Sequence, residues 1–291
     1  MKLLFSESEA DYGRYLYPYA IWALPEAGEA PADIFNAGFL PSAKGLDLFY
    51  LCRNLRVELA KFKPSSENRR ILRKGEGITM KLVPRAEFDL TAARKEFFLK
   101  YAEVRYGAGV MPPERLEVLF NSPLATHLMI FNDAQGAELG VVLLYLDAPR
   151  VAFYRFSFYD LNHFNRSLGL YLMTTATAYF AEQKFDHLYL GTCYSERALY
   201  KTQFAGLEFF NGFRWSPNVE ELKYLVRREV KKHLLETMEF REMFYEGSLE
   251  KIAAGGGLSV KFQERVRQDG EPEKHRDGTC VRPPNAEGAR R

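Results

Sequence analysis

Short hydrophobic runs with the spacing of β-strands occupy the middle of the chain. Met129–Phe131, Gly140–Leu146 and Val151–Tyr159 are rich in aliphatic and aromatic residues, and turn-forming residues separate them at 132–136 and 147–150. Apolar runs of this length between Gly, Asn, Asp and Pro residues are typical of strands joined by tight turns. The pattern therefore predicts three consecutive antiparallel strands.

Strand and helix patterns alternate on either side of this meander. Ile78–Val83 and His187–Leu190 have the composition of strands, whereas Leu90–Tyr106 and Arg166–Gln183 have helical spacing. Such alternation is typical of an α/β (α+β) domain. We assign residues 78–250 to this domain, whose order of three strands, a helix and a strand resembles that of an acyltransferase core.

The two ends of the chain differ from this central region. Residues 1–77 are rich in aromatic residues, Gly and Pro, and predict a small β-containing N-terminal domain with a strand at Leu46–Leu51. An apolar residue at every fourth position predicts one long amphipathic helix over Val219–Phe244. Residues 251–291 have too little apolar material to form a core, which predicts a disordered basic tail.

The composition is that of an ordinary globular protein. Of the 291 residues, 47% are hydrophobic and 27% are charged, and the formal net charge is only +2. Met1–Gly13 is too short and too acidic for the apolar part of a secretory signal, and no apolar run is long enough to span a membrane. These features predict a cytoplasmic protein without a membrane partner.

The cysteines do not form a recognisable ligand set. Cys52, Cys193 and Cys280 have neither paired spacing nor a nearby histidine cluster, so we expect free thiols, no metal and no cofactor. Cys193 follows a strand without an identifiable base, which favours a buried structural thiol over a nucleophile.

A local basic run lies between Arg53 and Lys74, where eight Lys and Arg residues occur with only two Glu residues. Within it, Arg69 and Arg70 are candidates for binding phosphates or a substrate carboxylate, since guanidinium groups bind both in a bidentate manner. A solvated basic surface explains the same residues equally well.

Two further segments are candidates for substrate binding. Arg166, Ser167 and Gly169 stand at the start of a predicted helix, where free backbone N–H groups can hold an anion. An ordinary capped helix would have the same sequence. The second segment, Tyr200–Phe204, contains Tyr200, Lys201 and Gln203 close behind a strand end, where clefts open in α/β sheets. A solvated lysine beside a packed tyrosine is the alternative.

Several short motifs occur in an order that resembles the arginyl-tRNA–protein transferase family, including its bacterial aspartate/glutamate leucyltransferase branch. The resemblance covers about residues 15–225. The motifs are Gly38-Phe39, Arg56-Val57, Phe62-Lys63-Pro64-Ser65, Asn68-Arg69-Arg70-Ile71-Leu72, Met111-Pro112-Pro113, Tyr154-Arg155-Phe156, Arg166-Ser167-Leu168-Gly169, Tyr189-Leu190-Gly191, Tyr200-Lys201-Thr202-Gln203-Phe204, Glu208-Phe209 and Arg214-Trp215.

The resemblance implies a GNAT-like acyltransferase domain that uses an aminoacyl-tRNA donor. The reaction would join leucine or arginine to the α-amine of proteins that begin with Asp or Glu, a mark for N-degron proteolysis. Tyr154, Tyr200 and Lys201 would be catalytic, with Lys201 or Arg70 facing the acceptor's acidic side chain and a hydroxyl or N–H near Tyr154 facing the oxyanion. The expected substrate-binding residues are Arg69, Arg70, Arg166, Ser167, Gly169 and Gln203.

The sequence departs from the family pattern at two places. Many members carry cysteines for an iron–sulfur cluster or metal, but here Tyr17-Pro18-Tyr19 stands at the first of these positions and only Cys52 matches the last. One thiolate cannot hold a cluster that needs four ligands, so the absence of a metal centre is expected. The segment between Gly191 and Tyr200 is also about two residues short, which affects the edge of the acceptor pocket.

Two other functions are compatible with the sequence. A GNAT-type N-acetyltransferase would bind the pyrophosphate of acetyl-CoA at Arg166–Gly169, although Tyr171 replaces the second glycine that such a site uses. A non-catalytic tRNA- or protein-binding relative would show salt-dependent tRNA binding without turnover.

Overall fold

The structure is a computed structural model that describes residues 1–7, 19–42, 45–228 and 233–254, without the side chains of 164–166 and 253. The described residues form one compact unit. Its helices are α1 (Pro31–Asn36), α2 (Ser66–Lys74), α3 (Ala92–Tyr106), α4 (Pro113–Asn121), α5 (Leu168–Glu182), α6 (Val219–Arg227), α7 (Met238–Tyr245) and α8 (Leu249–Ala253). Its strands are β1 (Lys2–Glu7), β2 (Tyr19–Leu24), β3 (Phe39–Pro41), β4 (Phe49–Leu51), β5 (Asn54–Glu58), β6 (Thr79–Pro84), β7 (His127–Asn132), β8 (Glu138–Asp147), β9 (Val151–Tyr159), β10 (His187–Thr192), β11 (Leu207–Phe210) and β12 (Trp215–Ser216).

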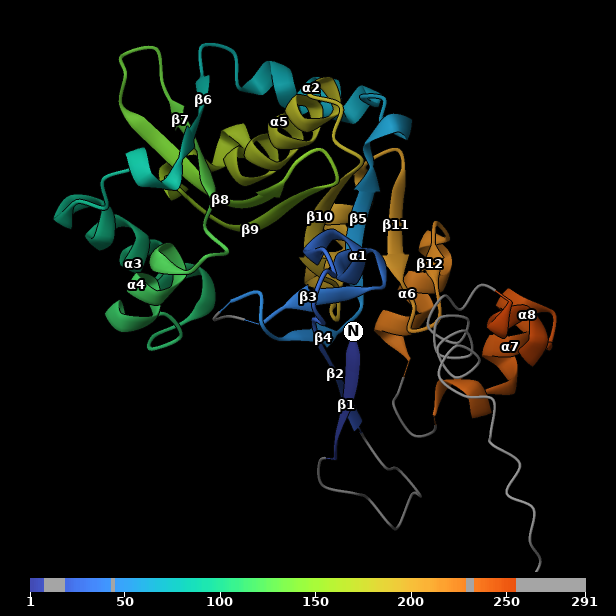
Figure 1. The fold of residues 1–291 in the computed structure, drawn as a ribbon. Helices are drawn as coiled ribbons and strands as arrows, with labels where there is room; N and C mark the ends of the chain where they lie inside the picture. The colour runs from blue at the N-terminus through green and yellow to red at the C-terminus, as the bar shows by residue number, and fades with distance from the viewer. Residues whose placement is uncertain (8–18, 43–44, 229–232, 255–291) are drawn as a thin grey trace, which may run out of the picture. The chain divides into compact units, whose positions relative to one another are not determined.

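An eight-stranded sheet is the centre of the unit, with the strand order β12-β11-β5-β10-β9-β8-β7-β6 (Figure 1). The meander expected from the hydrophobic runs is confirmed, because β7 pairs with β8 and β8 with β9, both antiparallel. The crossover through α5 places β10 parallel to β9. The mixed α/β class and the order of three strands, a helix and a strand are therefore confirmed.

The two parallel strands separate after a short paired stretch. β9 and β10 are paired only where 151–153 face 187–189. Beyond this point β9 continues along β8, and β10 continues along β5. A gap therefore opens in the middle of the sheet between the carboxyl-terminal parts of β9 and β10, at a place where α/β sheets commonly bind ligands.

Helices cover both faces of the large sheet. On one face, α5 packs beside α2, and Leu172, Ala176 and Phe180 of α5 are fully buried in the main core. On the other face, α3 and α4 form a second core in which the Phe98 ring stacks on Phe158 of β9 at a centroid distance of 4.5 Å. The separated ends of β9 and β10 thus lie between two helical layers (Figure 1).

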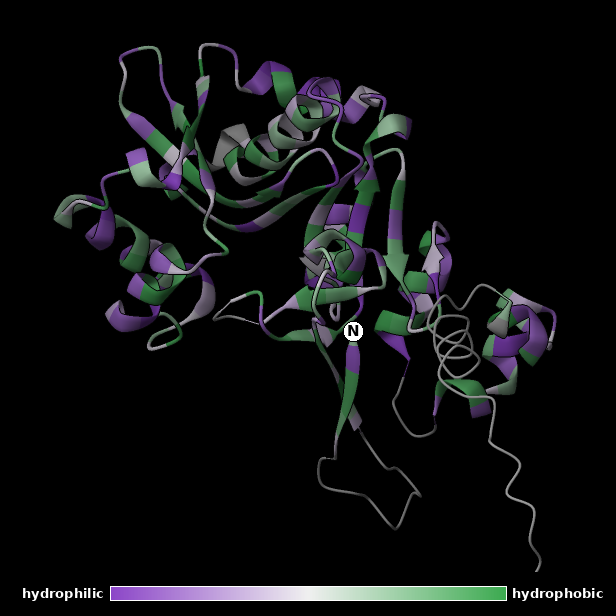
Figure 2. Ribbon diagram, viewed as in Figure 1, coloured by the Kyte–Doolittle hydropathy of each residue, from purple (hydrophilic) through white to green (hydrophobic). Residues whose placement is uncertain are grey.

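Helix α2 carries much of the basic run on its surface. A capping box starts the helix: Asn68 N–H donates to the Ser65 hydroxyl, and Ser65 N–H donates to the Asn68 side-chain oxygen, both at 3.1 Å. Ile71 points into the core, while the arginines on either side of it are exposed. Figure 2 shows the helix largely in hydrophilic colours.

The N-terminal segment contributes to both sheets. As expected, it contains a small sheet, with the order β1-β2-β4-β3. However, β5 is a central strand of the large sheet, and α2 packs against α5. Phe35 of α1 joins the two parts, because its ring stacks on Tyr145 and contacts Phe153 and Tyr189 at centroid distances of 5.0–5.8 Å. The boundary at residue 77 remains a prediction from the sequence.

The expectation of one long helix over Val219–Phe244 is wrong. Helix α6 ends at Arg227, Arg228 has an extended backbone, and a separate α7 begins at Met238. Folding back allows Phe240 of α7 to stack on Tyr224 of α6 at a centroid distance of 5.9 Å. A straight helix would carry these apolar residues away from the core, so tertiary packing overrides the continuous periodicity.

The described part of the chain ends just after the short helix α8. Residues 251–253, expected as part of the tail, belong to α8, whereas 255–291 lie outside the described residues. Among the helices that the structure describes, none has the length and apolar character needed to cross a membrane.

Candidate active site

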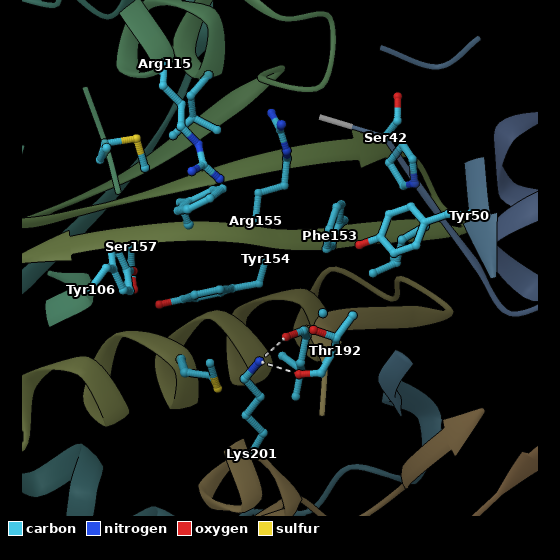
Figure 3. A pocket seen from close by; sticks show the side chains of 18 of the residues that line it. Ser42, Tyr50, Tyr106, Arg115, Phe153, Tyr154, Arg155, Ser157, Thr192 and Lys201 are labelled. Carbon is cyan, nitrogen blue, oxygen red and sulfur yellow. Dashed lines mark hydrogen bonds between the residues drawn. The ribbon is translucent and has the colours of Figure 1, made fainter. Parts of the chain in front are cut away.

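A cavity of about 660 Å³ lies where β9 and β10 separate. Its walls come from both strands, from α4, from the small sheet and from the short 3-10 helix η4 (Glu196–Gln203) (Figure 3). Tyr154, Tyr200 and Lys201, the three residues expected to be catalytic, all line this cavity. Residues that lie far apart in the sequence therefore meet at one place.

A β-bulge in β9 determines how the side chains enter the cavity. Leu144 of β8 faces Tyr154 and Leu143 faces Phe156, so Arg155 is an extra residue without a partner on β8. A bulge re-aims side chains, and bulges are common next to active sites. Tyr154 belongs to the core beneath α5, whereas Arg155 turns toward α4, where its Nη1 lies 3.5 Å from the Ser122 hydroxyl.

The Tyr154 hydroxyl is buried without a hydrogen-bond partner. The residue is only 5% exposed, and its Oη makes no hydrogen bond of regular geometry with the described residues, although the Ser157 side chain lies close enough to affect its pKa. Burial raises the pKa of Tyr154, so the hydroxyl stays protonated at neutral pH. Leaving a buried hydroxyl unpaired costs free energy, which makes this O–H a donor available to a bound substrate.

A second bulge, in β10, explains the position of Lys201. Tyr189 faces Arg56 and Gly191 faces Leu55, so Leu190 is the extra residue. Its carbonyl oxygen accepts a hydrogen bond of 2.9 Å from Lys201 Nζ, which also donates to Thr192 O at 3.3 Å (Figure 3).

The backbone conformation of Gly191 and the burial of the site hold Lys201 beside the bulge in β10. Gly191 has a φ of +77°, a conformation that favours glycine and turns both carbonyls toward Nζ. Burial lowers the pKa of Lys201. The ammonium group thus supports the cavity wall at the point where β10 leaves β9.

The cavity is rich in cationic groups. Besides Lys201, it is lined by Arg115 of α4 and Arg155 of β9, and among its lining residues in the described chain none is acidic. Burial lowers the pKa of Arg155 to about 10, and this side chain has no ion pair within the described residues. The cavity therefore suits a ligand with a negative charge.

A second cavity of about 350 Å³ lies at the start of α5. Tyr106, Ser157, Met173 and Tyr200 line both cavities, so the two are adjacent. The rings of Tyr106 and Tyr200 are 45% and 51% exposed, which leaves aromatic surface available for stacking.

The start of α5 is covered by a tyrosine. Ser167 precedes the helix with a φ of +52° and makes no capping hydrogen bond with its side chain, which instead accepts a hydrogen bond of 3.3 Å from Lys74 Nζ. A Cβ atom at Gly169 would lie 2.5 Å from the hydroxyl oxygen of Tyr159. Contact with this tyrosine therefore explains why residue 169 is glycine. Ser167 and Gly169, which the sequence predicts to bind substrate, line the second cavity.

The remaining predicted substrate-binding residues lie elsewhere. Arg69 and Arg70 are exposed on α2 and line neither cavity; Arg70 pairs with Glu67 at 2.5 Å, and Arg69 donates to Pro64 O at 2.6 Å. Gln203 donates to Tyr200 O at 3.1 Å and is likewise not part of a cavity wall. The side chain of Arg166 lies outside the described part.

Arg155 and Arg115 are the residues that sequence reasoning missed. Arg155 belongs to the motif Tyr154-Arg155-Phe156, in which only Tyr154 was a candidate site residue. The pattern of apolar residues in a strand gives no sign of the bulge at Arg155. Which of the two faces opens onto a cavity depends on strand pairing and on where β9 and β10 separate, and one sequence does not contain that information.

The cysteines and other residues that could bind a metal do not form a metal centre within the described chain. Cys193 is fully buried, and burial raises the pKa of its thiol, which disfavours the thiolate form. Within the described ranges, no group of three or more His, Cys, Asp and Glu side chains is arranged to hold a metal ion.

Among known proteins, the chain is similar to several aspartate/glutamate leucyltransferases. An aspartate/glutamate leucyltransferase of Saccharophagus degradans is 29% identical over 198 residues, which cover 63% of this chain and 81% of the relative. One from Marinobacter nauticus is 30% identical over 173 residues, covering 56% of this chain and 70% of the relative.

No family model matches the chain. Among solved structures, a GCN5-related glucosamine N-acetyltransferase region of a fungal multi-domain β-N-acetylglucosaminidase covers 54% of this chain and 19% of that one, with 10% identity and a TM-score of 0.35. Given the extent and identity of the leucyltransferase matches, the chain belongs to the aspartate/glutamate leucyltransferase family, a family of aminoacyltransferases.

Proposed function

We propose that the protein transfers leucine from leucyl-tRNA to the N-terminal α-amine of proteins that begin with Asp or Glu. The observation that carries this proposal is the cavity between β9 and β10. It has an unpaired hydroxyl donor at Tyr154, several cationic groups and no acidic lining residue in the described chain. The names of the relatives support the leucyl group and the Asp or Glu acceptor, and the resemblance seen in the sequence motifs supports the tRNA donor and the α-amine.

The reaction needs no nucleophile from the enzyme. The neutral α-amine, whose ordinary pKa is about 7.7–8.0, attacks the ester carbonyl carbon of the aminoacyl-tRNA. A C–N bond forms and the C–O bond to the terminal ribose breaks. The amine gives up a proton, and the ribose hydroxyl leaves with one. Alignment of two bound substrates lowers the barrier of such a step substantially.

Tyr154 is the group best suited to stabilise the transition state. Negative charge develops on the carbonyl oxygen during the attack, and a preorganised O–H donor in a buried site stabilises it. The Tyr154 hydroxyl is buried, protonated and without a partner in the described chain. Lys201 acts as a positioning residue, because its Nζ is already bonded to the carbonyls of Leu190 and Thr192.

The donor would approach from the side of α5. The second cavity offers the exposed rings of Tyr106 and Tyr200, and unstacked bases of RNA ends bind well to such rings. The end of α2 reaches the same region, since Lys74 contacts Ser167 at the start of α5. The exposed Arg69, Arg70 and Arg73 then provide a surface for the tRNA backbone.

Acetyl-CoA fits this arrangement less well. Acetyltransferases of the GNAT type bind the pyrophosphate at a helix start like that of α5, where backbone N–H groups are open to the ligand. Here the Tyr159 hydroxyl lies against Gly169, at the place such a group would approach.

A matrix of donors and acceptors tests the proposed function. Purified protein is incubated with labelled leucyl-tRNA, arginyl-tRNA or acetyl-CoA, and with peptides that begin with Asp, Glu, Asn or Ala. We expect label from leucyl-tRNA mainly on the Asp and Glu peptides, with much slower but measurable transfer to the Asn and Ala peptides. Transfer from arginyl-tRNA in place of leucyl-tRNA would show that arginine is the transferred amino acid. Acetylation alone would assign the protein to the acetyltransferases. Salt-dependent tRNA binding without transfer would indicate a binding protein.

A further inference from the structure

We propose that Arg155, assisted by Arg115, binds the side-chain carboxylate of the acceptor's first residue and thereby selects acidic N-termini. This inference rests on the proposed function, because it names the residues that distinguish one acceptor from another. It differs from the sequence-based expectation, in which Lys201 or Arg70 had this role. Those two cations are already occupied or distant: Lys201 is bound to two carbonyls, and Arg70 is paired with Glu67 on the surface of α2.

Arg155 is a half-buried cation whose charge lacks a counterion. Its guanidinium has the Ser122 hydroxyl at 3.5 Å, a weak contact, and no carboxylate partner in the described chain. Keeping a charge away from water costs free energy unless an opposite charge compensates for it. A guanidinium of this kind on the wall of a cavity is a binding group for a planar anion, and a carboxylate matches its fork geometry.

Arg115 reaches the same side of the cavity from α4. Its Nη1 donates to Val110 O at 2.7 Å, which leaves the other N–H groups of the fork available. Figure 3 shows Arg115 and Arg155 on one side of β9, with Tyr154 and Lys201 on the other. The aromatic rings of Phe153 and Phe156 also line the cavity and limit the access of water.

One substrate residue could meet both groups because Tyr154 and Arg155 are neighbours on β9. Tyr154 and Arg155 are consecutive, so their Cα atoms are about 3.8 Å apart, and their side chains point to opposite faces of the sheet, as consecutive side chains of a strand do. The α-amine and the side-chain carboxyl of an Asp or Glu residue branch from the same Cα atom. An acceptor at the free edge of β9 can therefore present its amine toward Tyr154 and its carboxylate toward Arg155.

A phosphate of the tRNA end is the other anion available to Arg155. The position of the arginine favours the peptide carboxylate, because it lies on the α4 side, away from α5 and from the adjacent tyrosine-lined cavity. The two anions predict different kinetics. Loss of a carboxylate contact affects acidic acceptors only, whereas loss of a phosphate contact affects every acceptor and raises the KM for the tRNA.

The test compares Arg155→Met with the unmodified full-length protein, using peptide pairs that differ only in Asp against Asn or Glu against Gln. We expect kcat/KM for the acidic peptides to fall about 10- to 100-fold, mainly through a higher KM for the peptide. For the amide peptides, kcat/KM should change less than about threefold. The KM for leucyl-tRNA should stay the same. Arg155→Lys should recover part of the preference for acidic peptides, since it retains the charge without the fork.

Two controls make the outcome decisive. Lys81→Met removes one positive charge from the exposed face of the edge strand β6 and should leave the Asp-to-Asn ratio unchanged. Arg115→Met should lower the Asp-to-Asn ratio of kcat/KM less than Arg155→Met does. If the Arg155 variants do not fold, an unchanged ratio in Arg115→Met would overturn the inference. An equal loss for acidic and amide peptides would overturn the inference while leaving the proposed function intact. No transfer by the unmodified protein to any peptide would overturn both.

Discussion

The ammonium group of Lys201 donates a hydrogen bond of 2.9 Å to the carbonyl oxygen of Leu190, the extra residue of the bulge in β10. A bulge leaves the backbone groups of its extra residue without partners in the sheet, and here a side chain from η4 supplies one. The same ammonium group bonds to Thr192 O, beyond Gly191. Lys201 therefore fixes the shape of β10 where it separates from β9.

Replacing Lys201 with Met should damage the site as a whole. Two buried carbonyls would lose their donor, which we expect to lower the free energy of unfolding by about 1–3 kcal/mol. Transfer to Asp and to Asn peptides should fall by the same factor. The measurement combines thermal unfolding with both transfer rates. A selective loss for Asp peptides would instead give Lys201 the recognition role that we assign to Arg155.

Replacing Tyr154 with Phe should separate activity from stability. The hydroxyl has no partner in the described chain, so its removal should leave the unfolding temperature unchanged or slightly higher. If the O–H stabilises the oxyanion, kcat should fall about 100-fold. Single-turnover transfer rates and thermal unfolding of the same samples check both parts. An unchanged rate would remove Tyr154 from the mechanism.

Neutralising the surface of α2 should weaken donor binding only. In the triple variant of Arg69, Arg70 and Arg73 to Gln, we expect a higher KM for leucyl-tRNA and a weaker dependence of that KM on salt concentration. The preference for Asp over Asn peptides should stay the same, because these side chains line neither cavity. A change in this preference together with an unchanged salt dependence would contradict the tRNA assignment.

Arg56 should prove structural although it stands in a family motif. Its guanidinium pairs with Glu208 at 2.8 Å, donates to the Asn36 side chain at 2.7 Å and lies 3.9 Å from the centre of the Trp215 ring. Arg56→Met leaves Glu208 without its counterion, so we expect a loss of about 3 kcal/mol in unfolding free energy. The double variant with Glu208→Met should lose less than the two single variants together, as urea unfolding would measure.

His187 predicts a dependence of stability on pH. Burial, with a smaller contribution from the Arg56 charge, lowers the pKa of His187 from 6.5 to about 4. As the pH falls from about 6.5 to 4, the unfolded chain takes up a proton at this residue before the folded chain does, so stability decreases over that window. His187→Gln should reduce this slope in urea unfolding between pH 4 and 7. A slope equal to that of the unmodified protein would contradict the assignment.

The sequence contained the local elements of the fold but not their long-range pairing. Strands β7, β8 and β9 follow from apolar runs and turn residues, which are local signals. The insertion of β5 between β10 and β11 depends on contacts between distant segments, as does the return of α7 onto α6. The periodicity of Val219–Phe244 was therefore real, but it did not determine where the helix ends.

The candidate site was predictable to a similar extent. Tyr154, Tyr200 and Lys201 were identified from a strand end and a motif order, and they do meet at one cavity. The position of Lys201 depends on the bulge in β10, and the access of Arg155 to the cavity depends on where β9 and β10 separate. Both are features of long-range strand pairing. Arg56, Glu208 and Trp215 come from three separate motifs and form one packed cluster, so part of the motif order reflects folding.

The proposed reaction can be measured directly by mass spectrometry of an acceptor peptide. A peptide beginning with Asp is incubated with leucyl-tRNA and the unmodified protein, beside its N-acetylated form, which lacks a free α-amine. We predict one added leucine at the N-terminus of the free peptide and none on the acetylated form. An unmodified Asp peptide after incubation with active leucyl-tRNA, or leucine added equally to both peptides, would contradict the proposed aminoacyl transfer.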